Sequence, residues 1–332
     1  MGNSCCNAEK EELLQDNMNG KPSRELKLRS VSKIAEHEQK EQAKSTPPHA
    51  AVKVTYMNPF TRKGNPHLVL SQEIPQDYIP QGFEHSPIMG PYCYENGATY
   101  QGQYRDGKRW GRGLQVWIDG SLYDGYWIDD KSYGYGRMVH SEGDEYIGEW
   151  RNDKANGKGK YISSHGITYI GEWKDDAQNG YGEELWPDGS VYRGEYKDSK
   201  KNGEGKFIWS DGSYYDGNFK ENRRNGYGKY RWKDGRSYEG NWLNDKMHGQ
   251  GTFTWTDGRK YLGEYIEDKK HGYGEFIAAD GTVYKGQWNF GKLERDLSHQ
   301  TAQTEDFEAP LPALSDKSLL PPFTRSSIPS SG

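Results

Sequence analysis

The sequence is poor in aliphatic residues. Only 32% of its 332 residues are hydrophobic, and its mean hydropathy is -1.12. Two conventional domains of this combined length would need more Leu, Ile and Val for their cores. Yet 14% of the residues are aromatic and 42 are glycine, whereas disordered chains lack aromatic residues and collagen needs Gly at every third position. We therefore expect a repeat structure in which rings pack near glycines.

Cysteines, long apolar runs and a strong excess of charge are also missing. The three cysteines, Cys5, Cys6 and Cys93, do not have the number or spacing of a disulfide framework or a zinc site. No segment approaches the roughly 18 apolar residues of a transmembrane helix, and the N-terminus lacks the apolar run of a secretory signal. The net charge of -5 argues against a general nucleic-acid-binding protein. These features predict an intracellular protein with no metal, cofactor or nucleic-acid partner.

A 23-residue repeat explains the composition. Each copy begins with tyrosine, has glycine two residues later and a second aromatic residue four residues later, and nine copies follow one another without insertion. The first tyrosines of the copies are Tyr100, Tyr123, Tyr146, Tyr169, Tyr192, Tyr215, Tyr238, Tyr261 and Tyr284. A Gly-x-Gly follows in the first eight copies, and Asp-Gly closes six of those eight.

The spacing within a copy predicts two strands. The tyrosine, the glycine and the second aromatic residue are two positions apart, so they lie on one face of a strand. The Gly-x-Gly continues with the same period into further rings, as in Gly251, Phe253 and Trp255, and Asp-Gly favours a tight turn. We therefore predict an all-β fold, an elongated single-layer antiparallel sheet of nine hairpins and a leading strand, with rings lying over strand glycines.

Two segments, Tyr146–Gly159 and Tyr238–Gly251, resemble the MORN (membrane occupation and recognition nexus) repeat, and the resemblance covers about residues 90–290. It implies a scaffold of the kind found in membrane junctions, the cortical cytoskeleton and cilia, including radial spoke heads. Some similar proteins also carry a lipid kinase or methyltransferase domain, for which the flanks of this array are too short. Ser163 and Ala278 depart from the pattern, because most other copies have tryptophan there.

Four regions are expected along the chain. Residues 1–44 form an N-terminal segment, 45–89 a Pro-rich linker, 90–291 the repeat array, and 292–332 a disordered Pro/Ser-rich tail.

The N-terminal segment carries candidate lipidation sites. Removal of Met1 would expose Gly2 for N-myristoylation, and Cys5 and Cys6 are candidates for S-palmitoylation. Two such signals give stable anchoring, and the basic residues between Lys21 and Lys33 would favour an anionic leaflet. Cys6 stands where the myristoylation pattern has Ser or Thr, so an ordinary exposed N-terminus is the alternative. Residues 26–44 could form a short helix.

The aromatic rows are the candidate binding surface for a helix or peptide of a partner. The residues selected for it are Tyr146, Trp150, Tyr169, Trp173, Trp186, Tyr192, Trp209, Trp232, Trp242 and Trp255.

Charge is uneven along the array. Residues 121–190 hold 7 basic and 14 acidic residues, whereas residues 191–260 hold 15 basic and 10 acidic residues. Such polarity can orient a partner or favour self-association, although drift among surface residues explains it equally well. A candidate basic patch for acidic phospholipid or an acidic protein surface consists of Arg223, Arg224, Arg231, Lys233 and Arg236.

The repeated polar residues do not indicate catalysis. A nucleotide site needs its glycine loop between a strand and a helix, whereas these glycines lie within strands. His248 and His271 share a repeat position with several asparagines, which favours a left-handed backbone position over a metal site. The recurring acids Glu149, Glu172, Glu195 and Glu264 are expected to form cross-strand ion pairs. A repeated constellation is unlike an active site, so no enzyme activity is expected.

The favoured interpretation is a MORN scaffold tethered to the cytoplasmic face of the plasma or ciliary membrane. It would bind a protein partner or acidic lipid along its aromatic face. One alternative is a structural subunit of the cilium, axoneme or cortical cytoskeleton. Another is a regulatory partner of a lipid kinase.

Overall fold

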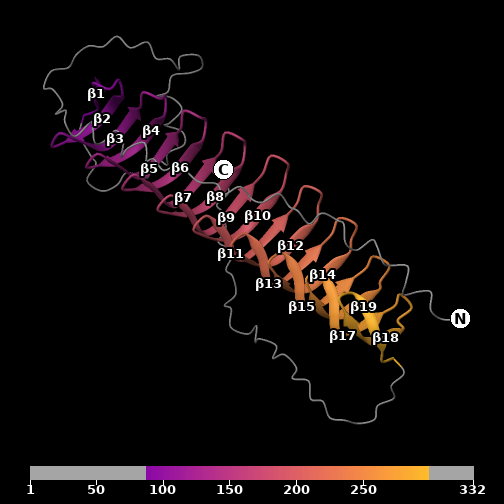
Figure 1. Ribbon diagram of the computed structural model, residues 1–332. Coiled ribbons are helices and arrows are strands. Elements are labelled where there is room, and N and C mark those ends of the chain that lie inside the picture. Colours follow the sequence, from indigo (N-terminus) through magenta and orange to yellow (C-terminus); the bar gives the residue numbers. More distant parts are fainter. Residues whose placement is uncertain (1–86, 299–332) are drawn as a thin grey trace, which may run out of the picture.

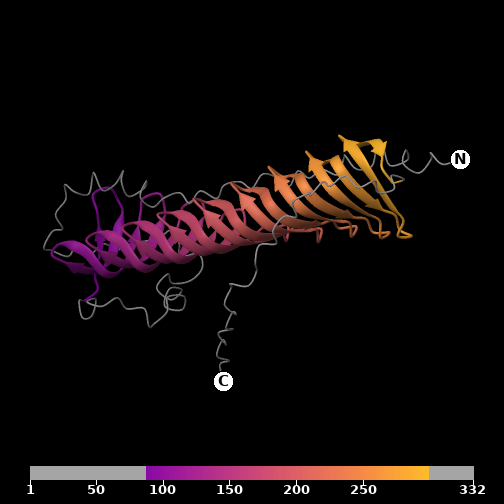
Figure 2. The ribbon, with the colours of Figure 1, turned by 90° about the horizontal axis from the view of Figure 1, so that it is seen from below.

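The computed structural model describes residues 87–298, which form one open antiparallel sheet of 19 strands (Figure 1). Each strand pairs with the next one in sequence, so the sheet is a meander with β1 (Met89–Cys93) at one end and β19 (Lys292–Asp296) at the other. The sheet twists along its length, and it is coiled more tightly near β1 than near β19 (Figure 2). Within the described residues no helix is long and apolar enough to cross a membrane.

Nine hairpins follow β1, one for each 23-residue copy. Their strands are β2 (Thr99–Arg105), β3 (Lys108–Val116), β4 (Leu122–Ile128), β5 (Lys131–Val139), β6 (Glu145–Arg151), β7 (Lys154–Ile162), β8 (Thr168–Lys174), β9 (Ala177–Leu185), β10 (Val191–Lys197), β11 (Lys200–Ile208), β12 (Tyr214–Lys220), β13 (Arg223–Arg231), β14 (Ser237–Leu243), β15 (Lys246–Thr254), β16 (Lys260–Ile266), β17 (Lys269–Ile277), β18 (Val283–Asn289) and β19. The predicted sheet of hairpins with a leading strand is confirmed. The predicted lipidation sites, basic cluster and short helix lie outside the described residues, as does the predicted tail beyond residue 298. The first residues of that tail are described and include β19, Lys292–Asp296.

A two-residue turn closes each hairpin along what we call the turn edge of the sheet. In the second copy both turn residues, Asp129 and Asp130, have a left-handed backbone with φ of 46° and 67°. This geometry matches the twist of the flanking strands and favours Asp, Asn and Gly. The predicted left-handed position of His248 and His271 is wrong. The left-handed residues of the copies are this turn pair, the first glycine of each Gly-x-Gly and the glycine of each connection to the next hairpin, such as Gly189.

That first glycine marks a bulge in the hairpin. In the third copy the pairing shifts between Gly148 and Trp150, and Gly157 on the opposite strand has a φ of 75°. Such a bulge adds to the local twist. The Asp-Gly, or the Glu142-Gly143 or His165-Gly166 that replaces it, lies in the five-residue connection to the next hairpin, along the opposite, loop edge. There the predicted tight turn is confirmed by hydrogen bonds such as Gly212 N to Trp209 O at 2.9 Å.

The core is a tyrosine lying over a pair of glycines. Gly148 and Gly159 face each other in the third hairpin, and the Tyr146 ring covers both from the face that we call the inner face. A Cβ added to either glycine would lie less than 3.0 Å from Tyr146. The Tyr146 hydroxyl donates to Glu149 O at 3.0 Å, and the ring is 1% exposed. The predicted packing of rings over glycines is thus confirmed. Tyr146 lies in the same strand as Gly148 and in the strand next to that of Gly159.

The tyrosines and the second aromatic residues of the copies form one continuous stack on this face, which we call the first aromatic ladder. Each of the first eight tyrosines contacts the second aromatic residue of its own copy and that of the next, edge to face, as Tyr123 contacts Trp127 and Trp150. This order runs from Tyr104 to Trp288 with centroid separations of 5.0–5.7 Å. Such pairs contribute about 0.5–1.5 kcal/mol each beyond the burial of their area.

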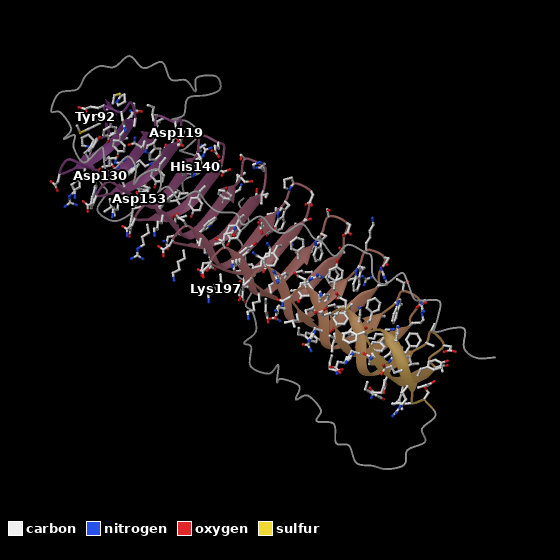
Figure 3. The ribbon with its side chains drawn as sticks, in the orientation of Figure 1. Tyr92, Asp119, Asp130, His140, Asp153 and Lys197 are labelled. Atoms are coloured by element: carbon white, nitrogen blue, oxygen red, sulfur yellow. The ribbon has the colours of Figure 1, made fainter. Side chains whose placement is uncertain are left out.

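Hydrogen bonds at the turn edge join each hairpin to the one before it. The second turn residue accepts a backbone bond through its side chain, as Asp176 Oδ1 does from Ala155 N at 2.7 Å, and its own N–H donates to Ala155 O at 3.1 Å. Asn222 makes the same pair of bonds with Lys201. Figure 3 shows Asp130 and Asp153 along this edge, opposite Asp119 and His140 at the loop edge.

The carboxyl group of Asp176 generates a pH-dependent prediction. Burial raises its pKa to about 6, so the folded chain binds a proton there more readily than the unfolded chain does. The ionised carboxylate therefore costs stability above pH 6, and this cost diminishes as the pH falls from 6 toward 4. Asp176→Asn, which copies Asn222, should raise the unfolding free energy at pH 7.5 by on the order of 1 kcal/mol, and most of this gain should be gone at pH 4.5.

Asp175→Asn is the matched control, because it removes the same charge from the exposed first residue of the same turn. Urea unfolding at both pH values measures the difference. A loss of stability in Asp176→Asn at pH 7.5 would contradict the burial account.

Candidate partner-binding face

A second aromatic ladder lies on the inner face beside the loop edge. It alternates between the last inner-facing residue of the second strand and the tryptophan that begins the following loop, and its neighbouring centroids are 4.6–5.9 Å apart. Its members are Trp186, Phe207, Trp209, Tyr230, Trp232, Phe253, Trp255 and Phe276.

The two ladders differ in accessibility. Six of the ten aromatic residues predicted to bind a partner belong to the first ladder and are 0–3% exposed, namely Tyr146, Trp150, Tyr169, Trp173, Tyr192 and Trp242. The other four, Trp186, Trp209, Trp232 and Trp255, are only partly buried. A partner that leaves the sheet intact can therefore reach these four tryptophans but not the first ladder. Tyr230 and Phe253 of the second ladder are buried as well, at 8% and 3% exposed.

The second ladder is confined to one part of the array, because only some copies have tryptophan as the first residue of the loop-edge connection. Its four tryptophans come from four consecutive copies, and Ala278 ends the row after Trp255. Toward β1 the position holds Ser163 and His140, and His140 was not among the predicted departures from the pattern. Four further ladder members recur with the same 23-residue period but were not among the residues predicted to bind a partner, namely Phe207, Tyr230, Phe253 and Phe276.

Cations lie over the rings of the second ladder. Lys201 Nζ is 4.9 Å from the Trp186 centroid, and Lys270 Nζ is 5.1 Å from that of Trp255. The guanidinium groups of Arg236 and Arg259 lie 5.7 Å and 5.5 Å from Trp232 and Trp255, and each also pairs with the aspartate of its own loop. Cationic groups thus lie beside the rings, although Lys201, Arg236 and Arg259 are each paired with a carboxylate.

A buried ion pair lies beside Trp186, at the end of the second ladder. Lys201 Nζ lies 2.8 Å from Glu184 Oε2, and both side chains are 4% exposed. The Tyr196 hydroxyl donates to the same carboxylate at 2.7 Å, and burial together with that carboxylate raises the pKa of Tyr196 well above its usual value. Both partners of this carboxylate belong to the packed core, which is the arrangement of a structural pair.

The predicted basic patch is divided by the structure. Arg224 points to the inner face, is 5% exposed and pairs with Asp245 at 3.2 Å. Arg223 begins β13 at the turn edge, whereas Arg231 ends the same strand at the loop edge. Lys233 and Arg236 lie in the connection that follows. The five residues therefore do not form one continuous surface.

The predicted ion pairs of Glu149, Glu172, Glu195 and Glu264 are not present among residues 87–298. Glu149 Oε1 instead accepts a bond from Lys158 N at 3.0 Å, in the bulge of its hairpin. Cross-strand ion pairs do form on the outer face from other positions, as between Arg193 and Glu183 at 2.8 Å. Within the described part of the chain, no group of three or more His, Cys, Asp and Glu side chains could hold a metal ion.

The family comparison agrees with the repeat geometry. The family model of the MORN repeat matches seven segments, at residues 100–122, 146–166, 169–191, 192–214, 215–235, 238–258 and 261–283. These hairpins are MORN repeats. The MORN repeat is a non-enzymatic scaffold unit, and the copies beginning at Tyr123 and Tyr284 share its fold here although the family model does not match them.

The other comparisons give little further information. No significant match was found among curated proteins. Among solved structures, the TCP10 domain of Danio rerio CPAP is 13% identical over 63% of this chain and 98% of that chain, with a TM-score of 0.36. The TCP10c domain of Drosophila melanogaster Sas-4 is 10% identical over 60% of this chain and 98% of that chain, with a TM-score of 0.22. Similarity at this level establishes no shared function.

Proposed function

We propose that this MORN-repeat chain is a scaffold that binds a segment of a protein partner along the second aromatic ladder. One observation carries the proposal: four tryptophans from consecutive copies remain partly exposed in a single row, although buried rings elsewhere already stabilise the sheet. Aligned, partly exposed rings with cations beside them are typical of a recognition surface. Because the basic residues are divided between faces, a protein segment fits this surface better than a lipid headgroup does.

We further propose that acyl groups on Gly2, Cys5 and Cys6 tether the scaffold to the cytoplasmic face of a membrane. The support is the sequence pattern alone, in which two palmitoylation candidates follow a myristoylation candidate. A structural role in the cilium or cortical cytoskeleton, regulation of a lipid kinase and self-association stay predictions.

Substitution of ladder tryptophans tests the binding proposal. Trp232→Ala combined with Trp255→Ala should reduce enrichment of the main cellular partner at least tenfold in proximity labelling with mass spectrometry. The control combines Tyr227→Ala with Tyr273→Ala, because these rings are 56% and 46% exposed on the outer face of the same region. Thermal unfolding would confirm that both variants are folded. Equal retention of the partner by both variants would contradict the proposal.

Gly2→Ala tests the tether. The variant should lose labelling by a myristate analogue and move from the membrane fraction to the soluble fraction, because palmitate can then no longer add to a first anchor. Cys93→Ser, which removes a thiol within the array, should change neither result. An unlabelled wild-type protein, or unchanged localisation of Gly2→Ala, would refute the tether while leaving the binding proposal intact.

A further inference from the structure

The spacing of the second aromatic ladder matches one particular backbone conformation. Successive tryptophans are two strands apart, which is about 9.6 Å at about 4.8 Å per strand. A polyproline II helix completes one turn in three residues, or about 9.3 Å. A proline-rich segment lying across the strands would therefore present the same side to each tryptophan in turn, in the order Trp255, Trp232, Trp209 and Trp186. Two turns of an α-helix rise about 10.8 Å, which matches the spacing of the tryptophans less closely.

The ladder is also suited chemically to such a segment. Grooves lined by aromatic rings bind polyproline II segments, because these segments are already extended and lose little entropy on binding. The cations along this ladder would select a segment that carries acidic residues. They are Arg236, Arg259 and Lys270, because Lys201 is buried in its ion pair with Glu184.

The chain itself contains a segment with these properties after β19. Residues 305–323 hold four acidic residues against one lysine, and they include four prolines, Pro310, Pro312, Pro321 and Pro322. The acids Glu305, Asp306 and Glu308 closely precede the first of these prolines. The segment therefore combines the composition and the charge that the ladder favours.

The place where the sheet ends makes the contact reachable. Ser298 Oγ accepts a bond from Lys285 N at 3.1 Å, near the start of β18 and hence at the loop edge, where the tryptophans lie. From β19 to β15, beside Trp255, is four strand steps, or about 19 Å. The twelve residues from Ser298 to Pro310 span about 37 Å in the polyproline II conformation. A tethered segment has a millimolar effective concentration, so even weak affinity keeps it bound.

We propose that the segment 305–323 docks along the second aromatic ladder of the same chain, running from Trp255 toward Trp186. About ten of its residues in polyproline II conformation would span the roughly 29 Å between these two tryptophans. This inference rests on the proposed function, since the tail would occupy the surface that a partner uses. A partner must then displace the tail from the ladder, and a partner segment that is itself acidic and proline-rich would compete best.

Photocrosslinking in the full chain tests the docking. With Phe307 replaced by p-benzoylphenylalanine, irradiation should give intramolecular crosslinks to the second ladder at least tenfold above those to outer-face residues. Peptide mapping resolves the two faces, because trypsin cleavage at Lys229 and Arg231 separates Tyr227 from Trp232.

Proline substitutions test the conformation of the docked segment. Pro310→Gly combined with Pro312→Gly should lower the ladder crosslinks about fivefold. Pro329→Gly, which lies outside the segment, should leave them unchanged.

Three results would overturn the inference: crosslinks on the outer face, crosslinks between different molecules in an isotope-mixed sample, or a yield that does not depend on Pro310 and Pro312. If any of these occurs while Trp232→Ala with Trp255→Ala still removes the partner, this inference alone fails. If neither the crosslinks nor the partner depends on Trp232 and Trp255, the proposed function fails as well.

Discussion

The sheet depends on the close approach of a tyrosine ring to two facing glycines. In the third copy, Tyr146 occupies the space that a Cβ of Gly148 or Gly159 would need, and its hydroxyl satisfies the carbonyl of Glu149. Because each ring is thereby held flat against the backbone, the second aromatic residue of the next copy can pack edge-on against it, as Trp173 does. One contact thus fixes both the hairpin and its stacking on the next. Repetition of the contact gives a single-layer sheet a core without many aliphatic residues.

This arrangement separates stability from recognition. The first ladder and the turn-edge hydrogen bonds join the copies, so the tryptophan position at the loop edge is free to vary among copies. It holds His140 and Ser163 in one part of the array and a row from Trp186 to Trp255 in another. A repeat protein can in this way confine a binding surface to a few copies while every copy keeps the same fold.

Much of the fold could be predicted from the sequence, because the period is exact and strand periodicity places rings and glycines on one face. The left-handed residues were assigned wrongly, since asparagine and histidine are also common in turns. His271 instead lies within β17, and the turn before it is made by Glu267 and Asp268, with φ of 49° and 68°. The binding face was predicted only in part, because the repeat period does not distinguish buried rings from accessible ones. Tyr192 is covered by the next copy, whereas Trp209 stays partly accessible. The division of the basic residues likewise depends on which face each one occupies.

The most direct test of the central claim is the unfolding free energy of Gly159→Ala compared with that of Gly189→Ala. Gly159 lies under the Tyr146 ring, whereas a Cβ at Gly189 would meet nothing within 4 Å, although its φ of +88° disfavours alanine. If ring-on-glycine contact supports the sheet, Gly159→Ala should cost roughly 3 kcal/mol or more, and Gly189→Ala only the roughly 1–2 kcal/mol of a left-handed alanine. An equal or smaller cost at Gly159 would contradict the account.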